Sequence, residues 1–306
     1  MTEKILVAGL INIETTLRVD QFPIQYNPVN YPFFGVQSSV SGVGYNIAKA
    51  LQTLGSSLHF LSLIGEDASG YLVRHALQED GIPTELVLSA MPQTAQSVIL
   101  YDENGRRQIY TDLKDIQTRK YPVERFEAAL ADVSLAILAN INWTRPFLRL
   151  AQQAGKVIAT DVHTIADLED GYNQDYMAAA NILFMSDEAL PCAPEEWARR
   201  IQSRYGTDIV VIGLGGEGAL LAVKDDNFLE RIPAVQTRPV VNTIGAGDSL
   251  FSCFNHIYLQ TRDPYEAIKK AIIFASYKIG SIGAADGFLT ADQLEHWVVD
   301  LANEKG

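Results

Sequence analysis

Cysteine and basic residues are both scarce in this 306-residue sequence. Cysteine occurs only at positions 192 and 253, which is too few for a disulfide framework or a cysteine zinc cluster. The 24 Lys and Arg residues are outnumbered by 37 Asp and Glu, so the formal charge is −13. A protein that follows a nucleic-acid backbone or lies on an anionic membrane needs a cationic surface. We therefore expect neither nucleic acid nor membrane as a partner.

The sequence also lacks an apolar run near the ~20 residues that span a membrane, and its N-terminal MTEKILVAGLINIE does not have a signal-peptide layout. Charged residues make up 20% and hydrophobic residues 47%, which is the balance of a globular protein. We expect a protein of a reducing compartment, the cytoplasm. The length allows one large α/β domain or two smaller ones.

Short apolar runs alternate along the chain with longer segments of helical period. The runs predict buried strands at 4–12, 57–64, 135–141, 156–161, 181–185 and 208–214. Helical spacing predicts helices over 43–54, 123–130, 143–154 and 194–205. Such alternation is typical of a parallel sheet covered on both faces. Asp161 and His163 follow a strand at its carboxyl end, where such sheets place ligands, and they serve either in a pocket or as supporting hydrogen-bond partners.

Two regions break this rhythm. Residues 13–40 contain three prolines and short pieces of strand-like pattern, such as TTLRVD. Residues 95–113 read as a hairpin, with a turn at Glu103-Asn104-Gly105 between two β-rich runs. We expect these two regions to form a small antiparallel sheet, separate from the main one.

The motif NTIGAGD at 242–248 precedes SLFSCFNHIYL, whose apolar residues recur at helical spacing. A glycine-rich turn therefore opens into a buried helix, with the free amides of Gly245, Ala246 and Gly247 at its N-terminus. Such amides and the helix dipole stabilise a phosphate or a developing negative charge. Asp248 is placed to act as a general base beside that anion. The alternative is structural: the glycines form the turn and Asp248 caps the helix.

Two further glycine-rich segments also allow two interpretations. SGVGYN at 41–46 is either a binding turn or a simple helix cap. GLGGEG at 213–218 matches the G-x-G-x-x-G pattern of dinucleotide-binding folds, which requires a helix next. The sequence continues with ALLAVKDD, typical of a strand, so a strand–turn–strand edge beside a nucleotide is preferred. An NAD-dependent oxidoreductase stays open as an alternative.

The order and separation of SGVGYN and NTIGAGD resemble the two signatures of the PfkB family, the ribokinase-like carbohydrate and nucleoside kinases. The family signatures read D-T-x-G-A-G-D and G-G-x-G-x-N, the latter followed by an apolar helix and a strand ending in G-x-D, here LSLIGED. The resemblance continues to GFLTADQLEHW near the end. It implies an α/β fold, a ribokinase-like three-layer α/β/α sandwich with a mainly parallel central sheet. The single kinase domain would cover 1–306, with a small β-sheet lid from about 13–40 and 95–113.

The resemblance implies transfer of the γ-phosphate of ATP to a hydroxyl group of a small sugar or nucleoside. Asp248 matches the catalytic base, and Gly245, Ala246 and Gly247 match the anion hole. Phosphoryl transfer depends on positioning and charge stabilisation more than on covalent chemistry. Mg²⁺ would arrive with ATP, held largely by phosphates and water, and no protein metal ligand is assigned. The nucleotide-binding residues implied are Gly213, Gly215, Gly218, Asn242, Thr243, Gly245, Gly247 and Gly283.

The substrate-binding residues implied are Asn12, Glu14, Gly42, Val43, Gly44, Asn46 and Asn142. Some of them depart from the family pattern: Glu14 stands where the family has the shorter Asp, and Val43 where ribokinases have Lys. These departures argue against ribose held by ribokinase-type contacts. They permit a nucleoside, or another furanose with an apolar substituent near Val43 and Tyr45.

Other departures concern cations and activity. Asn242 replaces an Asp that helps to hold a monovalent cation in potassium-activated members, which argues against potassium activation. The family motif N-x-x-E is not intact near 186–189, where Asp187 or Glu188 could serve. These changes slightly favour the alternative of a non-catalytic sugar- or nucleotide-binding regulator, whereas the intact Gly-Ala-Gly-Asp favours a kinase. We expect the lid strands to cover the pocket and to form a homodimer by pairing between subunits.

Overall fold

Apolar strands and amphipathic helices build two sheets. The computed structural model describes residues 3–103 and 106–303, and within these ranges the strands form one nine-stranded and one four-stranded sheet. The spatial order of the large sheet is β13 (Phe228–Pro233), β12 (Gly218–Val223), β11 (Ile209–Gly213), β10 (Ile182–Ser186), β9 (Val157–Asp161), β8 (Leu135–Leu138), β1 (Lys4–Ala8), β4 (Ser57–Gly65) and β5 (Val87–Met91). Neighbours from β5 to β11 run parallel, and β12 and β13 run antiparallel. The prediction of a mainly parallel sheet is confirmed.

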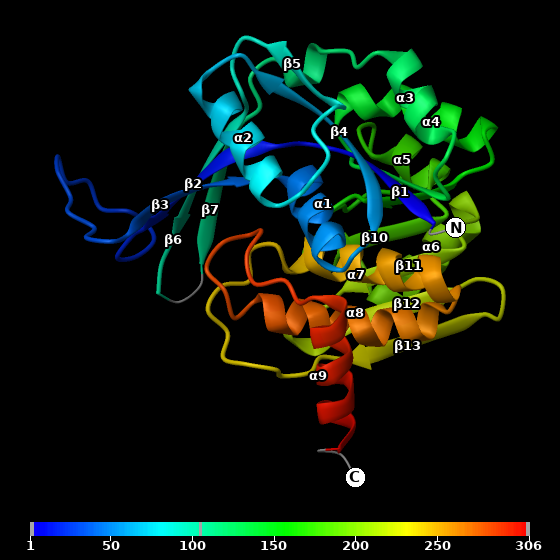
Figure 1. The fold of residues 1–306 in the computed structure, drawn as a ribbon. Helices are drawn as coiled ribbons and strands as arrows, with labels where there is room; N and C mark the ends of the chain where they lie inside the picture. The colour runs from blue at the N-terminus through cyan, green and yellow to red at the C-terminus, as the bar shows by residue number, and fades with distance from the viewer. Residues whose placement is uncertain (1–2, 104–105, 304–306) are drawn as a thin grey trace.

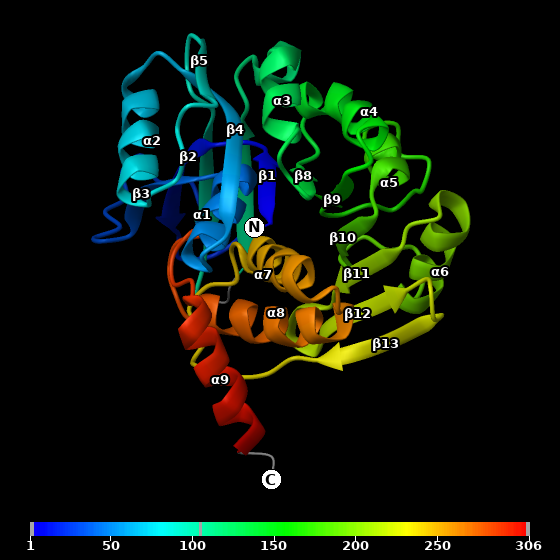
Figure 2. The same cartoon turned by 45° about the vertical axis from the view of Figure 1, so that its right-hand side comes forward.

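Helices cover both faces of the large sheet, because alternate side chains of each strand point to opposite sides. In β1, Ile5 and Val7 join one apolar cluster, and Leu6 and Ala8 join the other. The first cluster is closed by α1 (Val43–Thr53), α2 (Ala68–Glu79), α7 (Ala246–Thr261), α8 (Pro264–Lys278) and α9 (Ala291–Asn303). The second is closed by α3 (Val123–Leu130), α4 (Arg145–Gln153), α5 (Gln174–Ala179) and α6 (Pro194–Tyr205). The expected three-layer α/β/α sandwich is confirmed (Figure 2).

The small sheet lies beside the large one (Figure 1). Its spatial order is β3 (Val36–Ser41), β2 (Asn12–Arg18), β6 (Gln96–Tyr101) and β7 (Arg107–Asp112). The separate sheet was predicted, but its purely antiparallel pairing was wrong, because β2 and β6 run parallel. The reason is topological: β2 follows β1 and β6 follows β5, and both leave the large sheet in the same direction. Of the predicted turn, Asn104 and Gly105 lie outside the described residues.

The apolar run at 4–12, predicted as one strand, is divided between the two sheets. β1 ends at Ala8, and Asn12 begins β2. The chain turns at Gly9, where an added Cβ would lie 2.8 Å from the Cα of Gly44. The amide of Gly44 donates to the carbonyl of Leu10 at 3.0 Å, so this turn is packed against the start of α1.

Other predicted boundaries differ by a few residues. The structure matches the helices predicted at 123–130 and 194–205, whereas the helix at 143–154 begins as a 3-10 turn, η2 (Asn142–Thr144), before α4. Two more 3-10 turns are η1 (Ile116–Thr118) and η3 (Gly215–Glu217). Within the described ranges, the helices include none that is long and apolar enough to cross a lipid bilayer.

The sheet order reverses at β1, which has β4 on one side and β8 on the other. In open α/β sheets, ligands bind outside the carboxyl ends of the strands at such a switch point. The residues that follow β1 at this edge lead into β2 and meet the start of α1.

Candidate active site

The N-terminus of α7 forms the centre of the site. Gly245 precedes the helix with φ +77°, and an added Cβ there would lie 2.4 Å from the carbonyl oxygen of Ala284, so the turn requires glycine. The amide of Ala246 donates back to the carbonyl of Thr243 at 3.2 Å. That amide is therefore already engaged, and the expectation that all three amides of the turn are free is corrected.

Asp248 occupies the first turn of α7 without capping it. Within the described residues, α7 shows no side-chain cap. Instead, the side-chain amide of Asn46 donates to Oδ2 of Asp248 at 2.7 Å. The structural interpretation, in which Asp248 caps the helix, is therefore wrong, and the carboxylate faces the start of α1.

A hydrogen-bonded series links this carboxylate to the small sheet. The hydroxyl of Ser41, at the end of β3, lies 3.4 Å from Oδ1 of Asn46 and 3.2 Å from Oε2 of Glu14. Glu14 belongs to β2, Ser41 to β3, Asn46 to α1 and Asp248 to α7. The structure thus joins residues of both sequence motifs with one residue of the first strand of the small sheet.

The turn that begins α1 also depends on glycine. Gly42 has φ +105°, and an added Cβ at Gly44 would lie 2.6 Å from the carbonyl carbon of Gly9. Val43 is half-buried at the first position of the helix. Tyr45 is buried, and its hydroxyl donates to Asp80, so Val43 is the more accessible of these two side chains.

Asn12 and Glu14 bring unsatisfied oxygens into the site. Both side chains are buried, at 3% and 7% exposure. The amide of Asn12 donates to Oγ of Ser97 at 2.5 Å. Among the described residues, Oδ1 of Asn12 and Oε1 of Glu14 have no hydrogen-bond partner. Buried acceptors without a donor are costly, and hydroxyl groups of a bound molecule would satisfy them.

The electrostatics of the site favour a basic carboxylate. Burial raises the pKa of Asp248 above its ordinary value of 3.8, and the negative charge of Asp161 adds to the increase. The hydrogen bond from Asn46 opposes it, together with the positive charges of His163 and Lys278. Burial also raises the pKa of Glu14. A carboxylate with a raised pKa binds a proton more strongly, which suits a general base.

GLGGEG forms the turn between β11 and β12. Gly213 ends β11, Gly215 lies in η3 with φ +55°, and Gly218 begins β12 with φ +107°. β11 and β12 are antiparallel, so a strand follows this motif in place of the helix that a dinucleotide-binding fold requires. Asp187 donates its amide to the carbonyl of Gly213 at 3.1 Å, which brings the 186–189 segment to the same edge.

The loop after α8 is joined to NTIGAGD by Asn242. Oδ1 of Asn242 accepts from the amide of Ile244 at 2.9 Å, and Nδ2 of Asn242 donates to the carbonyl of Ile282 at 3.1 Å. Gly283 follows in this loop, and Thr243 is exposed. The predicted nucleotide-side residues 242, 243, 245, 247 and 283 therefore meet in one region, beside Ala284.

Asn142 follows β8, the neighbour of β1, and begins the 3-10 turn η2. Its side-chain amide donates to the carbonyl of Gln117 at 3.2 Å, and its Oδ1 accepts from Arg145 at 3.4 Å. In the described part of the chain, these hydrogen bonds account for both ends of the amide, so Asn142 differs from Asn12 in having no free oxygen. The side chain of Asn142 is therefore hydrogen-bonded within the protein, to Gln117 and Arg145.

Sequence reasoning also missed two side chains of the site, Ser41 as a hydrogen-bonding link and Lys278. Lys278 is fully buried on α8, and its Nζ donates to the carbonyl of Ile244. The helical spacing of residues 267, 271, 274 and 278 could have indicated that Lys278 is buried, because all four positions fall on one buried face of α8. Among the described residues, His, Cys, Asp and Glu do not form a group of three that could hold a metal ion.

Comparisons with known proteins show the family to which the chain belongs. A model of the pfkB family of carbohydrate kinases matches residues 2–291. Acarbose 7(IV)-phosphotransferase of Actinoplanes sp. is 27% identical over 259 residues, which cover 82% of this chain and 83% of the relative. An ATP-dependent ribose-1-phosphate kinase of Halopiger xanaduensis is 26% identical, with 92% of this chain and 93% of the relative covered.

Among solved structures, a microbiome-derived acarbose kinase superposes with a TM-score of 0.87 at 25% identity, covering 98% of this chain and 99% of that one. A ribokinase from Giardia lamblia gives a TM-score of 0.84 at 18% identity, which shows the shared fold. Because the family match extends over nearly the whole sequence, the chain belongs to the pfkB family of carbohydrate kinases.

Proposed function

We propose that this kinase transfers the γ-phosphoryl group of ATP to a hydroxyl group of a small sugar or nucleoside, with Asp248 as the general base. The observation that carries the proposal is the position of Asp248, in the first turn of α7 and hydrogen-bonded to Asn46 at 2.7 Å. A helix N-terminus favours negative charge, so the base and the site for the transferred group lie side by side.

The mechanism follows from this arrangement. Asp248 takes the proton of the acceptor hydroxyl as the oxygen attacks the γ-phosphorus, and ADP leaves with the bridging oxygen. The amides of Gly245 and Gly247 lie at the helix end where negative charge is stabilised. Mg²⁺, bound mainly by phosphates and water, would offset charge on the nucleotide. The raised pKa of Asp248 increases its affinity for the proton.

The acceptor would bind between β2 and the start of α1. Oδ1 of Asn12 and Oε1 of Glu14 lack partners among the described residues, so two acceptor hydroxyls can donate to them. Asn46 and the backbone of Gly42 to Gly44 border the same space. Because Asn142 is used by Gln117 and Arg145, we leave it out of the proposed acceptor contacts.

A sugar derivative is the acceptor class with the most support. The two curated relatives are named for phosphorylation of acarbose and of ribose 1-phosphate, and a structural neighbour is a nucleoside kinase in complex with inosine. Val43, half-buried at the turn, offers an apolar contact to such an acceptor. ATP would lie along Gly213 to Gly218 and the loop of 279–287. We place the reaction in the cytoplasm, where ATP is available and where free Cys192 and Cys253 stay reduced.

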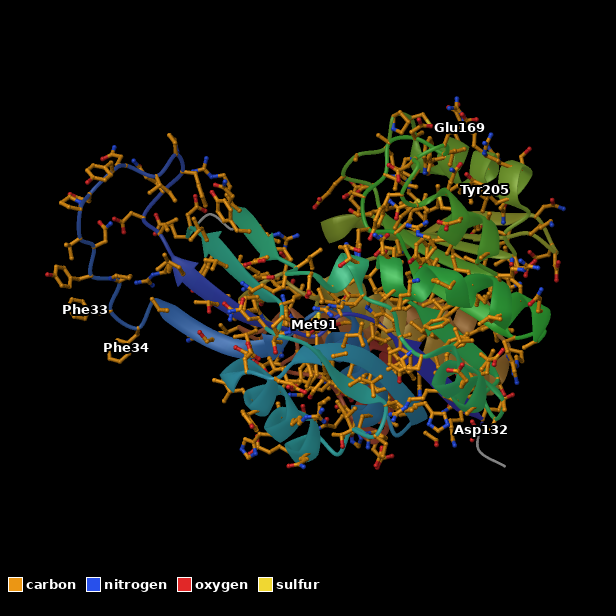
Figure 3. The ribbon with its side chains drawn as sticks, turned by 90° about the horizontal axis from the view of Figure 1, so that it is seen from above. Phe33, Phe34, Met91, Asp132, Glu169 and Tyr205 are labelled. Carbon is orange, nitrogen blue, oxygen red and sulfur yellow. The ribbon has the colours of Figure 1, made fainter. Side chains whose placement is uncertain are left out.

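The small sheet would serve as a lid and as a dimer contact. Large apolar side chains are exposed on it and on the loop between β2 and β3: Ile24, Tyr26, Val29, Tyr31, Phe33, Phe34, Val36, Val98, Ile109 and Tyr110. Phe33 and Phe34 lie at the far end of this loop and point away from the body of the molecule (Figure 3). Every residue of edge strand β7 is exposed. Exposed apolar surface beside an open strand edge favours association, here with a second copy of the lid.

A coupled ADP-release assay tests the proposed activity. Mg·ATP is offered with pentoses, hexoses, sugar 1-phosphates, oligosaccharides and nucleosides, and the phosphorylated product is identified by mass spectrometry. We expect turnover on one class. ATP binding without turnover on any acceptor would favour the non-catalytic regulator, and binding of NAD in preference to ATP would contradict the assignment to a kinase.

A further inference from the structure

Lys278 is a fully buried lysine at the end of α8. Its exposure is 0%, and its Nζ donates to the backbone carbonyl of Ile244. An ammonium group has three donors, and removing it from water is unfavourable unless opposite charges and hydrogen bonds compensate. Exposed lysines are the rule in proteins. The burial of Lys278 therefore requires neighbouring groups that stabilise its charge.

Charged groups from several elements face this ammonium group. Asp248 on α7, Asp286 in the following loop and Glu14 on β2 stabilise its charge, and Arg238 opposes it. Burial is the largest effect and lowers the pKa of Lys278 to about 8. The influence is mutual, because the positive charge of Lys278 lowers the pKa of both Asp248 and Glu14. One buried cation thus acts on both carboxylates of the proposed site.

Lys278 also holds the backbone of the NTIGAGD turn. Ile244, whose carbonyl it binds, lies directly before Gly245. The amides of Val241 and Asn242 donate to the carbonyl of Ile279, at 2.8 and 3.0 Å. The turn is therefore fixed by the main chain after α8 and by the buried ammonium group.

We propose that Lys278 is a positioning residue for phosphoryl transfer: its ammonium group fixes the 242–247 turn through the Ile244 carbonyl and supplies a positive charge close to the Asp248 carboxylate. This inference rests on the proposed function of Asp248. The charge favours the ionised base before transfer and offsets the negative charge that collects when nucleotide phosphates approach Asp248 and Glu14. His163 adds positive charge and Asp161 negative charge near the same carboxylate.

Two variants of Lys278 separate its charge from its hydrogen bond. Lys278→Met removes both, and Lys278→Gln keeps a donor for the Ile244 carbonyl without the charge. Lys270→Met is the matched control, because Lys270 lies on the same helix and pairs with Glu266 and Glu295 instead. Thermal melting verifies that each variant is folded before further measurement.

Two measurements require no acceptor. Hydrogen exchange reports the amides of 242–247, and ¹³C NMR titration of labelled Asp carboxyls reports Asp248, assigned with Asp248→Asn. We expect Lys278→Met to speed exchange about tenfold or more and to raise the pKa of Asp248 by about one unit. Lys278→Gln should restore slow exchange but keep the raised pKa. Lys270→Met should change neither quantity.

Kinetics complete the test on the acceptor that the wild type phosphorylates. Lys278→Met should lower kcat about tenfold or more, raise the KM for ATP because its phosphates then meet uncompensated carboxylates, and move the acidic limb of kcat to higher pH. An unchanged pKa of Asp248 in both Lys278 variants would overturn the inference, even if stability falls. A wild type that phosphorylates nothing would overturn the proposed function instead, while exchange and titration still decide the role of Lys278.

Discussion

Asn46 donates its side-chain amide to Oδ2 of Asp248 across 202 positions of sequence, at 2.7 Å. The contact joins the first turns of α1 and α7, which carry the two glycine-rich motifs. Ser41 extends it toward Glu14 on β2. The start of α1, which is proposed to bind the phosphoryl acceptor, therefore also orients the proposed base Asp248. Acceptor binding and proton removal both depend on Asn46.

Asn46→Ala should lower kcat about 10- to 100-fold, because the Asp248 carboxylate loses the donor that orients it. The KM for ATP should change little, since Asn46 lies on the acceptor side. Steady-state kinetics with both substrates varied measure the effect. Asn181→Ala is the control, as its amide also donates to a carboxylate, that of Asp208 at 3.0 Å. Equal losses in both variants would contradict a special role for Asn46.

Glu14 should make acceptor binding depend on pH. Burial raises its pKa above 4.5, so Glu14 becomes protonated at a higher pH than an exposed glutamate. As the pH falls into that range, the carboxylate loses an acceptor for substrate hydroxyls, and the KM for the acceptor should rise. Glu14→Gln should show a raised KM at every pH without this dependence. If the pH dependence persists in Glu14→Gln, another group is responsible.

Gly44→Ala should destabilise the protein by about 1–3 kcal/mol. An added Cβ would lie 2.6 Å from the carbonyl carbon of Gly9, and two backbone segments would have to separate. Urea denaturation measures the free energy of unfolding. Gly216→Ala is the control, because nothing lies within 4 Å of its added Cβ. Similar free energies for Gly44→Ala and the wild type would show that the close approach of Gly9 and Gly44 is not required.

His256 should make stability fall at mildly acidic pH. Burial lowers its pKa from 6.5 to about 4, so the unfolded chain binds the proton more readily than the folded protein does. Stability is therefore lost as the pH falls from about 6.5 toward 4. Between pH 7 and 5 the loss due to His256 is about 2 kcal/mol. The free energy of unfolding, measured by denaturation at pH 7 and pH 5, should differ less for His256→Gln than for the wild type. An equal difference in the two proteins would contradict this explanation.

Local patterns predicted much of the fold. The bounds of α3 and α6 followed from amphipathic spacing, and β1, β4, β8, β9, β10 and β11 followed from short apolar runs, whereas β5 and β13 were not predicted. The division of the 4–12 run between two sheets could not be predicted, since it depends on the contact of Gly9 with Gly44. The parallel pairing of β2 and β6 likewise depends on how distant segments leave the large sheet.

The sequence predicted those candidate site residues that lie within a single motif. Asp248 and the glycines of its turn lie within seven consecutive residues of sequence. The link through Ser41 and the burial of Lys278 arise only when β3, α1, α7 and α8 pack together. The hydrogen bonds of Asn142 with Gln117 and Arg145 likewise depend on tertiary packing, and its position after a strand gave no sign of them.

The central claim is that Asp248 removes the proton of the acceptor hydroxyl. The most direct measurement is kcat of Asp248→Asn on the acceptor identified in the ADP-release assay, with ATP affinity measured by calorimetry. The asparagine keeps the size of the side chain and cannot serve as a base. We predict a loss of about 10²–10⁴-fold in kcat, with unchanged ATP affinity and a folded protein. A kcat close to that of the wild type would contradict the proposed mechanism.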